Sequence, residues 1–184
     1  MDILNTLVVF IFPILMLISA FYDLLTMRIP NILVGLVTLA FFGTALLMGM
    51  GFPGIGWHLA AGAVVLAVTF TFFALGWIGG GDAKLAAGIA LWFGFDLLLP
   101  FLLYAAIVGG VLTLIILVSR RFMLPASFLR VGWIVKLHNE KTGIPYGIAL
   151  AAAALMVYPQ TPIFKHFADV PSQSEVLFEQ LQSL

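Results

Sequence analysis

Long stretches without a charged side chain are the feature that most limits how this chain can fold. No Asp, Glu, Lys or Arg occurs between positions 2 and 23, or within the ranges 32–50 and 57–78. Across 85–119 the one charged residue is Asp96. A helix needs roughly 20 mostly apolar residues to cross a bilayer, where its backbone must satisfy its own hydrogen bonds. These stretches therefore predict an all-α integral membrane protein.

The lengths of these stretches set the number of expected crossings. Residues 85–119 are too many for one crossing at a rise of about 1.5 Å per residue, so we expect a turn at 94–96. Only 9% of the chain is charged, against about a quarter in soluble domains, which leaves little polar surface to face water. We predict six crossings, with the fourth and sixth short: the stretch between positions 2 and 23, then 32–50, 57–78, 83–93, 97–118 and 144–158.

The basic residues predict the orientation of these helices. With the N-terminus outside, seven of the eight Lys and Arg residues fall in cytoplasmic segments, as the positive-inside rule requires. Lys165 is the one basic residue left outside. Asp23 and Asp82 then both lie at the cytoplasmic side. We expect a multi-pass protein of the cytoplasmic (inner) membrane.

One membrane domain accounts for most of the chain. We assign residues 1–158 to this domain, with a cytoplasmic loop at about 120–143 in which Trp133 and other apolar residues alternate with basic ones. That mixture is typical of a helix lying in the membrane interface, in contact with lipid. Residues 159–184 are predicted to be a polar C-terminal tail, with a short helix near 175–181.

Composition also excludes several kinds of chemistry. The chain has no cysteine, so disulfides, thiolate metal sites and cysteine nucleophiles are excluded. Its net charge is zero, which argues against a nucleic acid partner. We expect neither a metal nor another cofactor.

Two acidic residues stand out because carboxylates in or beside membrane spans are costly and usually functional. Asp23 closes the first charge-free stretch, and Asp82 follows three glycines, Gly79, Gly80 and Gly81. Glycine allows a close backbone approach, which would leave room for an extended peptide beside Asp82. Two structural alternatives without catalysis stay open. Asp23 could simply be the polar residue at which the first helix leaves the membrane, and Asp82 could simply cap a helix after a flexible turn.

As a pair, the two carboxyls predict aspartic proteolysis. Two neighbouring carboxyls cannot both ionise cheaply, so one stays protonated. The charged carboxylate can then take a proton from water while the neutral one protonates the scissile carbonyl.

Three other polar residues have simpler explanations. Lys84 lies two positions after Asp82, so on a helix the two side chains point in nearly opposite directions. We expect Lys84 to extend toward the lipid headgroups. His58 is expected at a polar outer helix end, and Asp96 in a solvated turn.

Three motifs together resemble the type IV prepilin peptidases. The first is Asp23 followed by Arg28-Ile29-Pro30-Asn31, and the second is Gly79-Gly80-Gly81-Asp82-Ala83-Lys84. The third is Ile144-Pro145-Tyr146-Gly147 at the start of the last crossing. The resemblance extends over all six predicted crossings.

That resemblance implies an intramembrane aspartic endopeptidase of the GxGD class. It would remove the basic leader of prepilin or pseudopilin substrates, which carry a hydrophobic helix, by cutting after a glycine at the cytoplasmic face. By position, Asp23 and Asp82 take the catalytic roles. A substrate-binding or supporting role is implied for Gly79, Gly80, Gly81, Pro145, Tyr146 and Gly147.

The resemblance also separates subgroups of the family. Larger bacterial members carry a four-cysteine zinc segment and methylate the new N-terminus, whereas this chain has no cysteine. We therefore expect no N-methyltransferase activity. The compact form resembles the peptidases of tight-adherence (Flp) pili, with the archaeal preflagellin peptidases as the alternative. Presenilin-like peptidases fit less well, because no Pro-Ala-Leu motif follows Asp82.

Two other functional classes remain as alternatives. A small proton-coupled transporter could use Asp23 and Asp82 as relay groups, but carriers usually hold such groups near the midplane in broken helices. A membrane scaffold without catalysis would give no reason for a second Asp beside three glycines.

Overall fold

The computed structural model describes residues 3–168, which fold into helices without any strand. The predicted helix near 175–181 lies outside the described residues. The helices are α1 (Ile3–Thr26), α2 (Asn31–Leu47), α3 (Phe52–Ala74), α4 (Gly80–Phe93), α5 (Leu98–Ser119), α6 (Gly132–His138), α7 (Tyr146–Val157) and α8 (Pro162–Ala168), with the 3-10 turns η1 (Ala126–Phe128) and η2 (Tyr158–Gln160).

The all-α prediction is confirmed, and each predicted crossing corresponds to a helix. A turn at 94–97 separates α4 from α5. Among the described helices, α1, α3 and α5 are long and apolar enough to cross a membrane, and α7 with α8 makes a fourth crossing if this bent pair is one span. Because α2 and α4 have only 17 and 14 residues, the count of six crossings stays a prediction. The outside location of the N-terminus also stays a prediction.

The two short helices α4 and α7 form the centre of the bundle. In α4 every residue from Leu85 to Phe93 is buried, and α7 is buried along most of its length. Both helices are rich in alanine and glycine, and such small residues let membrane helices pack closely. The long helices α1, α3 and α5 surround them and keep many large apolar side chains exposed, as a lipid-facing surface requires.

An aromatic cluster holds the helices together within the core. The ring of Phe12 lies 4.7 Å from the rings of both Trp92 and Tyr158. The Trp92 indole donates a hydrogen bond to the carbonyl of Val37, and the Tyr158 hydroxyl donates one to the carbonyl of Val9. These bonds satisfy the polar atoms of two fully buried side chains, which makes the cluster a rigid support for the bundle.

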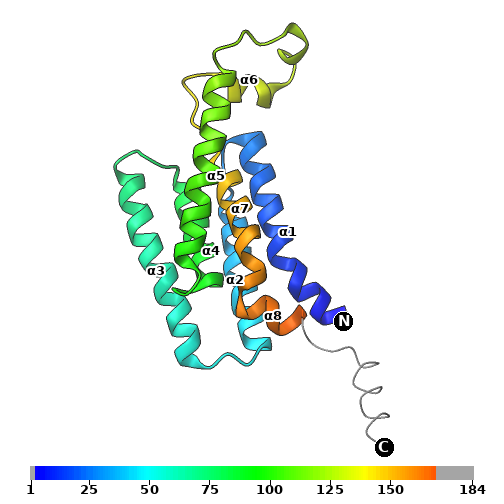
Figure 1. Cartoon of the computed structure of the whole chain (residues 1–184), viewed down its shortest axis with the longest axis vertical. Coiled ribbons are helices and arrows are strands. Elements are labelled where there is room, and N and C mark those ends of the chain that lie inside the picture. Colours follow the sequence, from blue (N-terminus) through cyan, green and yellow to red (C-terminus); the bar gives the residue numbers. More distant parts are fainter. Residues whose placement is uncertain (1–2, 169–184) are drawn as a thin grey trace, which may run out of the picture.

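The two ends of the bundle carry different short helices. As Figure 1 shows, α1 begins at the end that holds α8 and finishes at the end that holds α6. The predicted interfacial helix corresponds to the seven-residue α6, which has no buried residue. Its contact with a membrane surface stays a prediction.

The start of the predicted polar tail belongs to the folded bundle. Ile163 and Phe167 of α8 are buried in the hydrophobic core, and Thr161 is fully buried. Apolar side chains spaced four residues apart lie on one helix face, and here that face packs on α1. The prediction that the tail begins at residue 159 is therefore wrong for residues 161–168.

Candidate active site

Asp23 lies in the last turn of α1, at the end of the bundle that carries α6. The helix stops at Met27, whose positive φ of 57° ends the regular backbone, and the Met27 amide donates to the carbonyl of Asp23. The Asp23 side chain is only 4% exposed. A carboxyl buried to this extent requires compensating hydrogen bonds.

Asp82 lies in the first turn of α4, where Gly79 is the residue that caps the helix. Asp82 is therefore not the N-cap residue, but its carboxyl accepts a hydrogen bond from the Gly79 backbone, so the alternative of a helix-capping role stays open. One carboxyl oxygen of Asp82 folds back over Gly79, 2.9 Å from the point where a Cβ on that glycine would stand. Gly79 has extended backbone angles. Because glycine has no Cβ, it leaves room for the Asp82 carboxyl beside the turn.

The fold brings Asp23 and Asp82 to one small cavity. This cavity has a volume of about 250 Å³, and the two carboxyls are close enough to repel each other when both are charged. Because the two residues come from the end of α1 and the start of α4, their approach depends on the packing of the whole bundle. The cavity is lined by Asp23, Met27, Arg28, Ile29, Gly79, Gly80, Gly81 and Asp82.

The start of α7 supplies a hydrogen bond to the first carboxyl. The amide of Gly147 donates to Oδ2 of Asp23 at 2.7 Å. A Cβ at Gly147 would stand 2.8 Å from that same oxygen and 2.8 Å from Cδ1 of Ile29. Glycine is therefore required here by close approach, and Gly147 holds the Asp23 side chain in place.

Side chains of the protein itself occupy the space beside the glycines at the start of α4. A Cβ at Gly80 would stand 3.1 Å from the ring of Phe73, and one at Gly81 would stand 3.1 Å from Cβ of Ile29. Ile29 is buried in the turn between α1 and α2, so Gly81 allows this turn to pack on α4. The expected substrate contact at these glycines stays a prediction.

A second and larger cavity reaches Asp82 from the side of α5. It has a volume of about 730 Å³ and is lined by Asp82, Tyr146 and Arg120 together with residues of the loop before α4 and of 142–144. The Tyr146 hydroxyl donates to the carbonyl of Ala105, and its ring lies over Gly109. Pro145 precedes Tyr146 as the N-cap of α7. The 145–147 motif thus lies next to both carboxyls.

Arg120 is a residue of this site whose role the sequence did not reveal. Its guanidinium group donates hydrogen bonds to the carbonyls of Leu137, Thr142 and Gly143. The guanidinium therefore ties the end of α5 to the segment that leads directly into α7 and Gly147. From the sequence Arg120 counts only among the basic residues that set orientation, and no local motif marks it.

The remaining candidate residues lie elsewhere. Lys84 donates to Oδ1 of Asn31 at 3.0 Å. His58 is buried, with Nδ1 2.6 Å from the carbonyl oxygen of Leu91, so the expectation of a polar outer edge is wrong. Asp96 is exposed in its turn, as expected. Within residues 3–168 no three His, Asp or Glu side chains are grouped as metal ligands would be.

Comparison with known proteins gives one match. The family model described as the type IV leader peptidase family matches residues 10–114, which include Asp23, the three glycines and Asp82. Comparisons with curated proteins and with solved structures gave no significant match.

Proposed function

The chain belongs to the type IV leader peptidase family, and from that premise we propose that it is an intramembrane aspartic endopeptidase. The proposed substrate is a prepilin or pseudopilin with a short basic leader, a glycine at the cut and a hydrophobic helix after it. Asp23 and Asp82 are the proposed catalytic residues.

One observation carries the aspartic mechanism: the carboxyls of Asp23 and Asp82 line the same small cavity. Such a pair tends to share one proton, which supplies an acid and a base at the same pH. Both carboxyls lie at one end of the bundle, which suits cleavage at a membrane surface more than relay through the midplane of a carrier.

The chemistry follows from this shared proton. The ionised carboxylate accepts a proton from water as the water oxygen bonds to the scissile carbonyl carbon, and the neutral carboxyl donates its proton to the carbonyl oxygen. The tetrahedral gem-diol intermediate then collapses as the C–N bond breaks. The leaving amine takes a proton from the carboxyl that acted as base, and one gem-diol hydroxyl gives its proton to the carboxylate that acted as acid, which yields the carboxylic acid product and restores the pair. Neither proton transfer is assigned to one of the two residues, because strongly coupled carboxyls titrate as a pair.

The cavities suggest how substrate and water reach the pair. The larger cavity beside Asp82 is lined by Thr113, Thr142 and residues of the loop before α4, which suits water and an extended peptide backbone. A basic leader would remain outside the bilayer at this end, and the hydrophobic helix would stay in the lipid. This arrangement fits a multi-pass protein of the inner membrane with its carboxyl pair at the cytoplasmic face.

A cleavage assay tests the proposal. The purified chain in phospholipid vesicles is incubated with a peptide that carries a basic leader, a glycine and a hydrophobic segment, and the products are identified by mass spectrometry. We expect one cut, directly after the glycine, and no cut in a matched peptide with valine at that position. Recovery of intact peptide in both cases, or cleavage at scattered positions, contradicts the proposal.

A further inference from the structure

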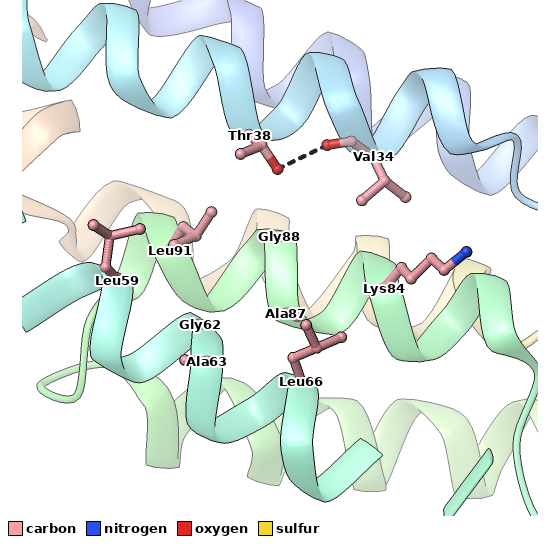
Figure 2. Close-up of a pocket in the computed structure, with 10 residues that line it drawn as sticks. All are labelled: Val34, Thr38, Leu59, Gly62, Ala63, Leu66, Lys84, Ala87, Gly88 and Leu91. Atoms are coloured by element: carbon pink, nitrogen blue, oxygen red, sulfur yellow. Dashed lines mark hydrogen bonds between the residues drawn. The ribbon is translucent and has the colours of Figure 1, made fainter. Parts of the chain in front are cut away.

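A groove lies between α2, α3 and α4, and none of its lining residues lines the two cavities at the carboxyl pair. Figure 2 shows α4 as its floor, with α2 along one side and α3 along the other. The groove has a volume of about 280 Å³, and its lining is Val34, Thr38, Leu59, Gly62, Ala63, Leu66, Lys84, Ala87, Gly88 and Leu91.

The groove is apolar along its length. The one hydroxyl in its wall, that of Thr38, is already bonded to the carbonyl of Val34. Leu59 and Leu66 remain about two-fifths exposed on the α3 side. Apolar side chains exposed on this part of a membrane protein face hydrocarbon, so a chain of apolar atoms is the expected occupant.

The width of the groove suits an acyl chain. An α-helix has a diameter of about 10–12 Å with its side chains, whereas an acyl chain is much narrower and can lie lengthwise between α2 and α3.

A cationic group stands at one end of the groove. Lys84 is the only charged residue of the lining, and it lies near the end of the bundle that holds the carboxyl pair. Its ammonium has three donors, of which one is bonded to Asn31. Asn31 begins α2, whose N-terminus has no side-chain cap, so amide donors and the positive end of the helix dipole lie beside the ammonium.

We propose that this groove is a specific phospholipid site, in which an acyl chain fills the apolar part and the headgroup phosphate binds Lys84 and Asn31. The charge of the phosphate matches the ammonium, and the apolar wall matches the chain attached to it. An anionic headgroup such as phosphatidylglycerol fits best, because it lacks a cation of its own to compete with Lys84. This site stands independently of the proposed peptidase activity.

Phosphate binding at Lys84 would also fix the depth of the carboxyl pair relative to the lipid headgroups. Lys84 follows Asp82 by two residues, about 3 Å along the helix axis. A phosphate bound at Lys84 therefore holds Asp82 at the depth of the headgroups. The bound lipid would therefore set the depth, along the membrane normal, at which the two carboxyls contact the substrate peptide where it emerges from the bilayer.

Photolabelling tests the proposal in the full chain. Vesicles of phosphatidylcholine contain a trace of phosphatidylglycerol with a diazirine on its acyl chain, and adducts are mapped by mass spectrometry after illumination. We expect adducts on Leu59, Ala63 and Leu66. The same diazirine on phosphatidylcholine should label these residues less, by roughly fivefold, the ratio that corresponds to ~1 kcal/mol per basic residue near an anionic lipid surface.

Two variants and a matched control separate the parts of the site. Ala63→Phe fills the groove and should remove most adducts, whereas Val64→Phe on the next, also exposed position of α3 should leave them. Lys84→Gln should abolish the preference for phosphatidylglycerol while acyl labelling persists. Circular dichroism verifies that each variant is folded.

Three results would overturn the proposal. The first is labelling spread evenly over the exposed residues of α3, and the second is an unchanged headgroup preference in Lys84→Gln. The third is displacement of the lipid by a prepilin-like peptide that itself becomes crosslinked in the groove, which would make the groove a substrate site.

Discussion

The backbone amide of Gly147 donates a hydrogen bond of 2.7 Å to Oδ2 of Asp23, a residue 124 positions earlier in the chain. The bond joins the start of α7 to the end of α1, where Asp23 lines the cavity shared with Asp82. It is the only hydrogen bond from another helix to the Asp23 carboxyl within the described residues.

Replacing Gly147 with alanine should disable the site. The added Cβ would stand 2.8 Å from Oδ2 of Asp23, so the carboxyl must move or α7 must shift. Overpacking of this kind costs about 1–3 kcal/mol, and we expect cleavage to fall by at least about tenfold. Gly43→Ala in α2, with open space around its Cβ, is the matched control and should cleave normally. Equal activity of the two variants in the peptide assay would contradict this role.

Gly79→Ala should lower activity more than stability. The backbone of Gly79 is extended, so alanine is tolerated there, but its Cβ would stand 2.9 Å from the carboxyl oxygen of Asp82. A side-chain oxygen can rotate away at little cost, which would leave the fold intact and the carboxyl misplaced. Thermal unfolding and the cleavage rate are measured together, with Gly56→Ala of α3, which also has open space, as the control. A large fall in stability with an unchanged rate per folded molecule would be the opposite of this prediction.

Arg120→Gln should slow cleavage, whereas Arg121→Gln should not. Arg120 donates to three loop carbonyls ahead of α7, while its neighbour is exposed. Each net hydrogen bond is worth ~0.5–1.5 kcal/mol, so loss of the set should reduce kcat by about tenfold or more. We expect kcat to change more than KM, because the guanidinium positions the loop rather than the substrate. Arg120→Lys should recover only part of the rate, since an ammonium lacks the planar fork. A change in KM alone would assign Arg120 to substrate binding instead.

Chelating agents should leave the cleavage rate unchanged, and the product should carry an unmethylated N-terminus. The sequence contains no cysteine, and its three histidines lie apart in α3, α6 and α8. The rate is measured with and without EDTA, and product mass with and without a methyl donor. A rate lost with EDTA and restored by a divalent metal, or a product heavier by one methyl group, would contradict this expectation.

Hydrophobic stretches predicted the helices well because each membrane helix satisfies its own backbone. The turn at 94–97 followed from length alone. The pairing of Asp23 with Asp82 was also accessible, because two helix ends on the same side must lie near each other in a small bundle. These predictions use only the hydrophobic periodicity, the length and the charge of local segments.

Contacts between distant segments were not accessible in this way. Ile163 and Phe167 look like part of a polar tail, but both are buried in the core and their helix contacts α1. The sequence places His58 at a helix end, but α3 begins at Phe52, and the carbonyl of Leu91 approaches the imidazole from α4. The bond from Gly147 to Asp23 and the bonds of Arg120 depend in the same way on tertiary packing, which no local pattern encodes.

The most direct test of the account is the cleavage rate of Asp23→Asn and Asp82→Asn. An amide can neither accept the proton of the attacking water nor supply one to the scissile carbonyl, and such acid–base steps contribute about 10²–10⁴-fold. Each variant, in the same vesicles and with the same peptide, should lose at least about 100-fold in rate while remaining folded in the membrane. Asp96→Asn, an exposed carboxyl in the turn before α5, should cleave at the unmodified rate. If either Asp23→Asn or Asp82→Asn cuts the peptide at a rate close to that of the unmodified chain, the two carboxyls are not the catalytic pair.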